Sequence, residues 1–247
     1  MHSHLVALIA SAALVASQNT NLQTVFPVAT TTTNLAAART LSAGESFDGG
    51  MKQWDRSPST CSEQAEGGDK DAVFILQDGA TLSNVIIGPN NGEGIHCKGK
   101  CTLNNVWWTD VCEDAATFKQ TSGVSYVNGG GARGASDKIF QHNGAGTLAV
   151  KNFYAKDSGK LYRSCGNCGT QYTRHSTFTN VKTDGVKLLA GVNANYGDTT
   201  QIKNSCVLNG QICNIFTGNN SGKEPTKIGT APSGTVCVAE AVKTAGC

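Results

Sequence analysis

The sequence predicts an all-β fold, a right-handed parallel β-helix with short coils of about 21 to 28 residues. A motif of the form apolar-x-Asn-apolar recurs at Leu82–Val85, Leu103–Val106, Val150–Phe153 and Phe178–Val181, with weaker copies at Tyr126–Gly129 and Ile202–Ser205. Between the motifs, segments such as 72–76 and 81–87 alternate in period two, and Gly-rich turns separate them. No segment longer than about ten residues keeps the apolar period of a helix.

The motif asparagines are expected to stack. In a parallel β-helix, identical positions of successive coils form ladders, and asparagine side chains on one ladder can hydrogen-bond to one another. Ordinary turn residues would explain one or two asparagines, but less well the full set at 84, 105, 128, 152, 180 and 204.

The start of the chain is typical of a secretory signal peptide. An apolar stretch at 5–16 is too short to span a bilayer and is followed by polar residues. We expect a signal peptide at 1–17, a flexible Ala/Thr-rich lead-in at 18–39 and one β-helix domain at 40–247. No other stretch is apolar enough for a membrane helix, so the sequence predicts a secreted, extracellular protein.

The cysteines favour structural disulfides. All ten lie after the signal, and an even number in a secreted chain predicts up to five bridges. Cys165 and Cys168 resemble a zinc or redox pair, but no second pair has matching spacing. The sequence does not give the connectivity.

The charge balance argues against nucleic acid as the partner. Formal net charge is only +2, whereas phosphate binding needs a strongly basic face. We expect no membrane partner, and a monomer.

The repeat predicts a column of carboxylates. Nine residues after the asparagines of three successive coils come Glu93, Asp114 and Asp137, with Glu113 beside the second. Adjacent coils lie about 4.8 Å apart, so these groups repel one another unless a cation lies between them. Ca²⁺, which takes oxygen ligands in flexible geometry, is the natural candidate in a secreted protein. A solvated acidic edge is the alternative.

Basic residues continue the column. Lys138 follows Asp137 directly, and Lys160 and Arg163 lie on the next coil. This arrangement suits an acidic polysaccharide such as polygalacturonate, held partly by metal and partly by direct charge. The reaction that it favours is β-elimination, because the C5 proton lies α to the uronate carboxylate. Lys138 is the leading base, and Lys160 and Arg163 bind substrate and stabilise the transition state.

The chain also resembles a known family, the pectate lyases of polysaccharide lyase family three from bacteria, fungi and oomycetes. The matching stretches are 78–88, 94–97, 105–115, 129–133, 135–143, 151–154 and 159–168, and the likeness covers roughly 40–240. The resemblance implies a compact parallel β-helix, calcium dependence and cleavage of polygalacturonate.

Site residues also follow from this resemblance. It implies calcium ligands at Glu66, Glu93, Glu113, Asp114 and Asp137, a catalytic lysine at Lys138, and basic partners at Lys160 and Arg163. Arg133, in the matching stretch 129–133, is a further candidate for substrate binding. The family usually has Asp where this chain has Glu93, and Glu63 competes with Glu66.

Two other functions remain open. A polygalacturonase-like hydrolase would need paired carboxylates with one kept protonated, but the expected Asn-Thr-Asp, Gly-His-Gly and Arg-Ile-Lys signatures are absent. A noncatalytic protein could bind pectate in the plant cell wall without cutting it. The base beside the acidic column disfavours this second reading.

Overall fold

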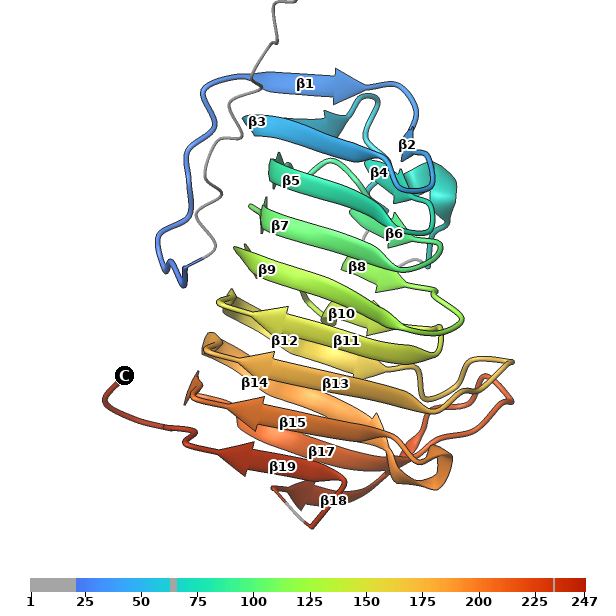
Figure 1. Ribbon diagram of the computed structural model, residues 1–247, viewed down its shortest axis with the longest axis vertical. Helices are drawn as coiled ribbons and strands as arrows, with labels where there is room; N and C mark the ends of the chain where they lie inside the picture. Colours follow the sequence, from blue (N-terminus) through green and yellow to red (C-terminus); the bar gives the residue numbers. More distant parts are fainter. Residues whose placement is uncertain (1–20, 63–65, 233) are drawn as a thin grey trace, which may run out of the picture.

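The computed structural model describes residues 21–62, 66–232 and 234–247. Their strands stack into one elongated solenoid (Figure 1). The strands are β1 Thr32–Leu35, β2 Arg39–Leu41, β3 Ser46–Arg56, β4 Phe74–Leu76, β5 Ala80–Ile87, β6 Ile95–Cys97, β7 Cys101–Trp108, β8 Asp114–Phe118, β9 Val124–Arg133, β10 Lys138–His142, β11 Gly146–Lys151, β12 Tyr154–Ser164, β13 Arg174–Thr179, β14 Lys182–Asn193, β15 Thr199–Lys203, β16 Cys206–Leu208, β17 Gln211–Thr217, β18 Thr226–Ala231 and β19 Cys237–Glu240. Two short 3-10 helices, η1 Asp69–Asp71 and η2 Ala194–Tyr196, interrupt them.

The strands form three faces of parallel ladders. Face A contains the first halves of β3, β5, β7 and β9, followed by β11, β13, β15 and β19. Face B contains β1, the second halves of the same long strands, the first halves of β12 and β14, and β16. Face C contains β2, β4, β6, β8 and β10, the second halves of β12 and β14, and β17. Among the strands of the described residues, only β18 runs antiparallel, against β17. The predicted parallel β-helix is therefore confirmed.

The motif asparagines form the corner between faces A and B. Asn84, Asn105, Asn152, Asn180 and Asn204 all have φ near +50°, a left-handed conformation that asparagine tolerates better than other residues with a Cβ. Asn105 donates to Asn84 at 2.9 Å, and Asn180 donates to Asn152 at 2.7 Å. Each coil therefore turns at the same place, and the side chains join neighbouring coils.

The expected register is wrong by one residue at Asn128. Asn128 pairs with Asn104, not Asn105, and Gly129, with φ 72°, takes the left-handed corner. Glycine enters this conformation without steric cost, so the turn formed one residue later than the asparagine marker suggested. Lys138, not Asp137, consequently lies opposite Asp114.

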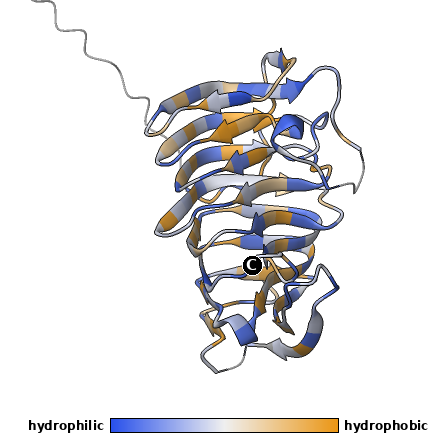
Figure 2. Ribbon diagram, turned by 90° about the vertical axis from the view of Figure 1, so that its right-hand side faces the viewer, coloured by the Kyte–Doolittle hydropathy of each residue, from blue (hydrophilic) through white to orange (hydrophobic). Residues whose placement is uncertain are grey.

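Apolar side chains from the three faces fill the interior. Figure 2 shows hydrophobic and hydrophilic positions alternating along the strands. Phe74, Phe118, Phe140 and Phe178 are fully buried. Phe118 and Phe140 meet edge to face at 5.8 Å, and Phe178 meets Tyr162 in the same way at 5.7 Å. The interior is packed, so ligands can bind only on the outside of the coils.

All ten cysteines are paired, which confirms structural disulfides. The bridges are Cys61–Cys112, Cys97–Cys101, Cys165–Cys168, Cys206–Cys247 and Cys213–Cys237. The pairing of Cys165 with Cys168 leaves neither thiol for zinc. Within the described residues, no helix is both long and apolar enough to cross a membrane.

The chain is already ordered before Thr40. The signal peptide expected at 1–17 lies outside the described residues, but 21–39, expected to be part of a flexible lead-in, lie against the coils (Figure 1). The Phe26 ring packs on Trp107 at 5.2 Å and on Tyr154 at 5.8 Å. The strand β1 then pairs with β3. Buried aromatic contacts order a segment whose local composition suggested flexibility.

Candidate functional site

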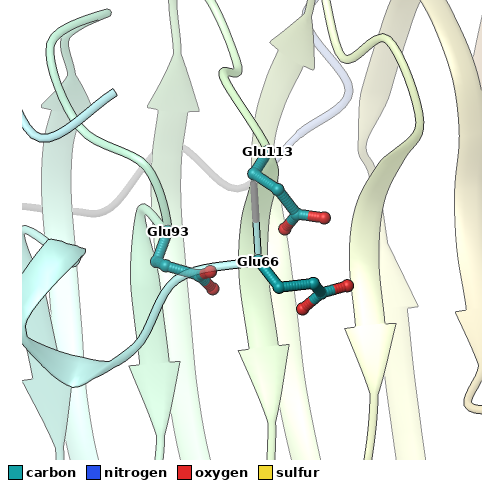
Figure 3. A group of neighbouring side chains, drawn as sticks. All are labelled: Glu66, Glu93 and Glu113. Carbon is teal, nitrogen blue, oxygen red and sulfur yellow. The ribbon is translucent and has the colours of Figure 1, made fainter. Parts of the chain in front are cut away.

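Three glutamates meet at the corner between faces B and C. Glu93 lies just before β6, Glu113 lies just before β8, and Glu66 lies on the loop between β3 and η1. Each offers a carboxylate oxygen within 4.8 Å of the other two, and Figure 3 shows the three side chains extending to the same side of the ribbon. The disulfide Cys61–Cys112 ties the loop that carries Glu66 to the residue beside Glu113.

Burial makes this cluster costly to keep charged. The pKa of Glu113 is raised, first by burial and then by the charges of Glu66 and Glu93, although Lys138 opposes the shift. Glu113 Oε2 is buried and has no hydrogen-bond partner among the described residues. Asp114 is only 3% exposed, and burial raises its pKa well above the ordinary value. A cation bound here would relieve both effects.

Glu93 is held from two sides. Its Oε1 accepts the Gly67 backbone N–H at 2.7 Å, and its Oε2 lies 2.8 Å from His96 Nε2. The other ring nitrogen of His96 lies 2.7 Å from Asp69 on η1. Burial alone would raise the pKa of Glu93, but the His96 hydrogen bond and charge lower it overall. This residue, a departure from the usual family pattern, is thus fixed as a carboxylate.

Lys138, at the start of β10, joins the acidic cluster to the basic residues. Its Nζ lies 3.2 Å from Glu113, 3.4 Å from Asp114 and 2.7 Å from Asp137. Burial would lower the pKa of Lys138, but these three carboxylates raise it above its ordinary value. Lys138 is 7% exposed, so the ammonium acts as an internal counter-ion.

Asp137 links the two lysines. It accepts hydrogen bonds from Lys138 and from Lys160, which is directly opposite Lys138 on β12. Burial would raise the pKa of Asp137, yet these two hydrogen bonds lower it overall. Asp137 therefore stays ionised between two cations and is not part of the cluster of Glu66, Glu93 and Glu113.

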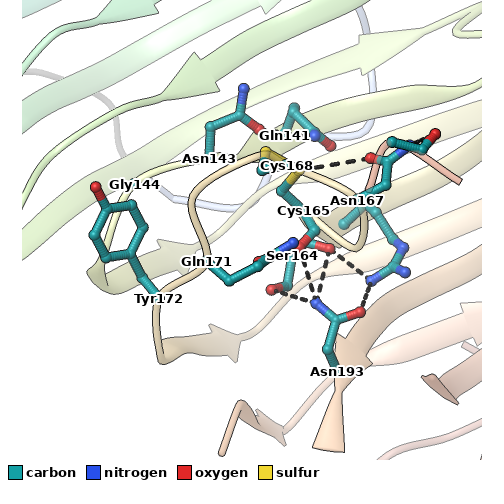
Figure 4. Close-up of a disulfide and its surroundings, with 12 residues drawn as sticks. Gln141, Asn143, Gly144, Ser164, Cys165, Asn167, Cys168, Gln171, Tyr172 and Asn193 are labelled. Atoms are coloured by element: carbon teal, nitrogen blue, oxygen red, sulfur yellow. Dashed lines mark hydrogen bonds between the residues drawn. A yellow bond between two sulfur atoms is a disulfide. The ribbon is translucent and has the colours of Figure 1, made fainter. Parts of the chain in front are cut away.

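Arg163 is fixed by a buried polar network. Its Nη1 donates to the Ser164 carbonyl at 2.6 Å and to Asn193 Oδ1 at 3.0 Å, and its guanidinium lies 4.1 Å from the centre of the Phe216 ring. Asn193 in turn donates to Ser164 and to the Cys165 carbonyl, beside the disulfide Cys165–Cys168 (Figure 4). Burial lowers the pKa of Arg163 to about 10.

Several of these groups line one cavity of about 300 Å³, although Glu93, Glu113 and Asp114 do not. Its lining includes Glu66, Asp137, Lys138, Gln141, Lys160, Arg163 and Phe216. We call it the catalytic cavity, after the role proposed for it below. In the described structure, neither Arg163 Nη2 nor Gln141 Oε1 has a hydrogen-bond partner, although both are buried. Gln141 is opposite Arg163 in the register, so the two residues bring an unpaired acceptor and an unpaired donor to the same cavity.

Three outcomes differ from the expectations for single residues. Gln141 was missed, although its place opposite Arg163 would have suggested it. Arg133 does not line the catalytic cavity: it donates to the Thr109 carbonyl at 2.8 Å and lies over the Phe26 ring. Asp114 is buried, lies 3.4 Å from Lys138 Nζ and is not part of the three-glutamate cluster.

The chemistry of the donors fits calcium. Ca²⁺ takes six to eight oxygen ligands in flexible geometry, and carboxylates are its common protein ligands. Glu66, Glu93 and Glu113 supply three such groups, and the orphaned Glu113 Oε2 is a free ligand atom. Exposed Glu66 leaves one side of the cluster open to water or to a substrate oxygen.

Comparison with known proteins gives consistent matches. The pectate lyase family model matches residues 23–223. The chain is 48% identical over 210 residues to probable pectate lyase E of Neosartorya fischeri, covering 84% of this chain and 82% of that protein. It is 51% identical over 193 residues to pectate lyase H of Emericella nidulans, covering 77% and 74%.

Solved structures show the same fold. Pectate lyase PelI from Erwinia chrysanthemi, in complex with tetragalacturonic acid, superposes with a TM-score of 0.69 at 31% identity, covering 88% of this chain and 71% of that chain. Its catalytic domain gives 0.68 at 31% identity, covering 86% and 98%. With the β-helix and the site geometry established above, these matches show that the chain belongs to the pectate lyase family.

Proposed function

We propose that the protein is a secreted, monomeric pectate lyase that cleaves polygalacturonate by β-elimination with Ca²⁺ as cofactor. The observation that carries this proposal is the catalytic cavity, in which Glu66 of the acidic cluster lines the same space as Lys138, Lys160 and Arg163. Relatives named as pectate lyases and a similar enzyme bound to tetragalacturonic acid support the activity and the substrate class. Five disulfides fit an oxidising, extracellular location.

Arg163 and Gln141 would orient a uronate in the catalytic cavity. The free Arg163 Nη2 can donate to a carboxylate oxygen, and Gln141 Oε1 can accept from a sugar hydroxyl. Because Nη1 is already held by Ser164 and Asn193, the guanidinium needs little ordering when substrate binds. Lys160 adds positive charge on the neighbouring coil.

Lys138 is the proposed base. Burial favours its neutral amine, and the carboxylates around it favour the ammonium. Lys138 can accept the C5 proton only when the negative charge of those carboxylates is balanced by another cation. Calcium, when bound, would supply that balance and would acidify the C5 proton by coordinating the uronate. The C4 glycosidic oxygen then leaves and takes a proton from solvent.

The assay follows the unsaturated uronide product by its ultraviolet absorbance. Purified protein is incubated with polygalacturonate at mildly alkaline pH, with calcium or with chelator. Absorbance that appears only with calcium supports the proposal. New reducing ends without absorbance would point to hydrolysis, and binding without either product would point to a noncatalytic wall-binding protein.

A second experiment tests the role of Lys138. The Lys138→Ala variant should lose turnover, and added small primary amines should restore part of it, because an amine can occupy the space and accept the proton. Lys151→Ala, an exposed lysine on β11, is the matched control. Near-normal turnover in Lys138→Ala would remove Lys138 as the base, and Arg163 would then be the alternative.

A further inference from the structure

A second cavity of about 300 Å³ adjoins the catalytic cavity on the C-terminal side. Its lining includes Gly159, Lys160, Lys187, Gln211, Asn214 and Phe216. Lys160 and Phe216 belong to both cavities, so the two are continuous at these side chains. We propose that this second cavity is a subsite for a further galacturonate of the same polysaccharide chain, one that binds without metal. The inference rests on the proposed function.

The register sets the direction of the combined groove. Lys138 pairs with Lys160, Lys160 with Leu188, and Leu188 with Gln211 on successive strands of face C. Coils are about 4.8 Å apart, so the two cavities follow one another along the solenoid axis. A linear polymer lying on this face would pass from the catalytic cavity into the second one.

Asn214 provides an unfilled hydrogen-bonding position. The residue is only 9% exposed, lines the second cavity, and its Oδ1 has no hydrogen-bond partner in the part of the chain that the structure describes. A buried acceptor left without a hydrogen bond destabilises the protein. A sugar hydroxyl is a donor of the right kind, so binding would satisfy this atom.

The charges of the second cavity differ from those of the catalytic cavity. Lys160 and Lys187 are its charged residues, and none of the described residues that line it is acidic. The catalytic cavity has both signs, with Glu66, Asp137 and Glu224 in its lining. The second cavity can therefore attract a uronate carboxylate directly, with no metal to bridge like charges.

Phe216 supplies the apolar wall between the cavities. Its ring is half-buried, and the Arg163 guanidinium lies against it at 4.1 Å from the centroid. An aromatic ring in this place can contact the apolar C–H face of a sugar. The same side chain thus separates two binding positions and contributes to both.

The test measures kcat/KM for the series from digalacturonate to hexagalacturonate. The variants are Lys187→Ala and Asn214→Ala, with Lys151→Ala on face A as the matched control. We expect kcat/KM to fall by about 10-fold for oligomers long enough to reach the subsite. In the parent, kcat/KM should increase when the oligomer gains the sugar that fills this subsite, and in the variants that increase should be missing. Equal losses for all lengths, or no loss at any length, would overturn the subsite.

Calorimetric titration with hexagalacturonate in the presence of chelator gives a readout without turnover. Binding that persists without calcium and weakens several-fold in Lys187→Ala supports a metal-independent subsite. Binding that is unaffected by Lys187→Ala would refute it and leave the lyase proposal intact. If the unsubstituted protein gave no unsaturated product but kept Lys187-dependent binding, the proposed function would fail and the subsite would stand.

Discussion

Replacement of Arg163 by lysine should separate recognition of the uronate from simple positive charge. Lysine keeps the charge but loses the planar fork of donors. Its single ammonium would be drawn to the Ser164 carbonyl and Asn193 Oδ1, which now hold Nη1 at 2.6 and 3.0 Å. No donor would then replace Nη2, the atom without a partner in the described structure that we propose for the uronate carboxylate.

The size of the effect follows from the burial of this group. Arg163 is 7% exposed, so solvent does not screen the lost contact. A hydrogen bond between charged groups contributes about 1.5 to 3 kcal/mol, which corresponds to roughly 10- to 150-fold in kcat/KM. If the contact forms equally in the ground state and the transition state, the change appears in KM; if it strengthens in the transition state, it appears in kcat.

The chain contains a matched control for this variant. Arg39 also stacks on an aromatic ring, with its guanidinium 3.8 Å from the centre of Phe47, but it does not line the catalytic cavity. Arg39→Lys should leave kcat/KM on polygalacturonate within about 2-fold, a change of less than 0.5 kcal/mol. Steady-state kinetics with both variants, with thermal unfolding as a check on folding, make the comparison. Activity of Arg163→Lys equal to that of Arg39→Lys would refute the assigned role of Nη2.

Three further predictions concern the cluster, the cavity wall and the coil corner. The raised pKa of Glu113 contributes stability that is present below its ordinary value of 4.5 and is lost as the pH rises. In chelator, the free energy of unfolding of Glu113→Gln should therefore increase relative to that of the parent between acid and neutral pH. Urea unfolding measures this difference, and a difference that stays constant with pH would contradict the prediction. Gly166→Ala should lower kcat/KM with little change in Tm, because an added Cβ would overlap Arg163 Nη2 and Pro225; unchanged kinetics would count against this packing. Asn105→Ala should lose about 2 to 4 kcal/mol of stability, because alanine is strained in the left-handed backbone and the asparagine hydrogen bonds are lost. Asn105→Gly should lose less, because glycine is not strained there. Equal Tm values for the two variants would disprove backbone strain.

The repeat made the fold predictable, but its markers were less reliable for register. Asparagine is favoured at a left-handed corner, and the spacing of these residues therefore measures coil length. At Asn128 the neighbouring Gly129 could take the corner equally well, and glycine did. A single-residue difference put Lys138 in the place expected for Asp137, opposite Asp114. The carboxylates that the structure brings together are Glu66, Glu93 and Glu113, and of the predicted column only Glu93 is among them.

Other parts of the site depend on contacts that a repeat cannot encode. Glu66 lies on a loop whose position is fixed by the disulfide Cys61–Cys112, and a pairing over 51 residues could not be chosen from sequence. Asn214 and Phe216 lie beyond the last asparagine marker, where counting had no reference. Phe26 gave no local sign of order, because its partner rings are far along the chain.

The segment before β1 has a consequence for how the solenoid unfolds. Coils in a solenoid contact only their neighbours, so opening can begin at one end and proceed stepwise. Here Leu22 lines a cavity with Asn180 and Asn204 on the later coils, Phe26 packs on Trp107 and Tyr154 in the middle, and β1 covers the first coil. Because the segment before β1 contacts early, middle and late coils, local unfolding at one end of the solenoid depends on contacts at the other end. The solenoid should therefore unfold in a single cooperative transition and not gradually.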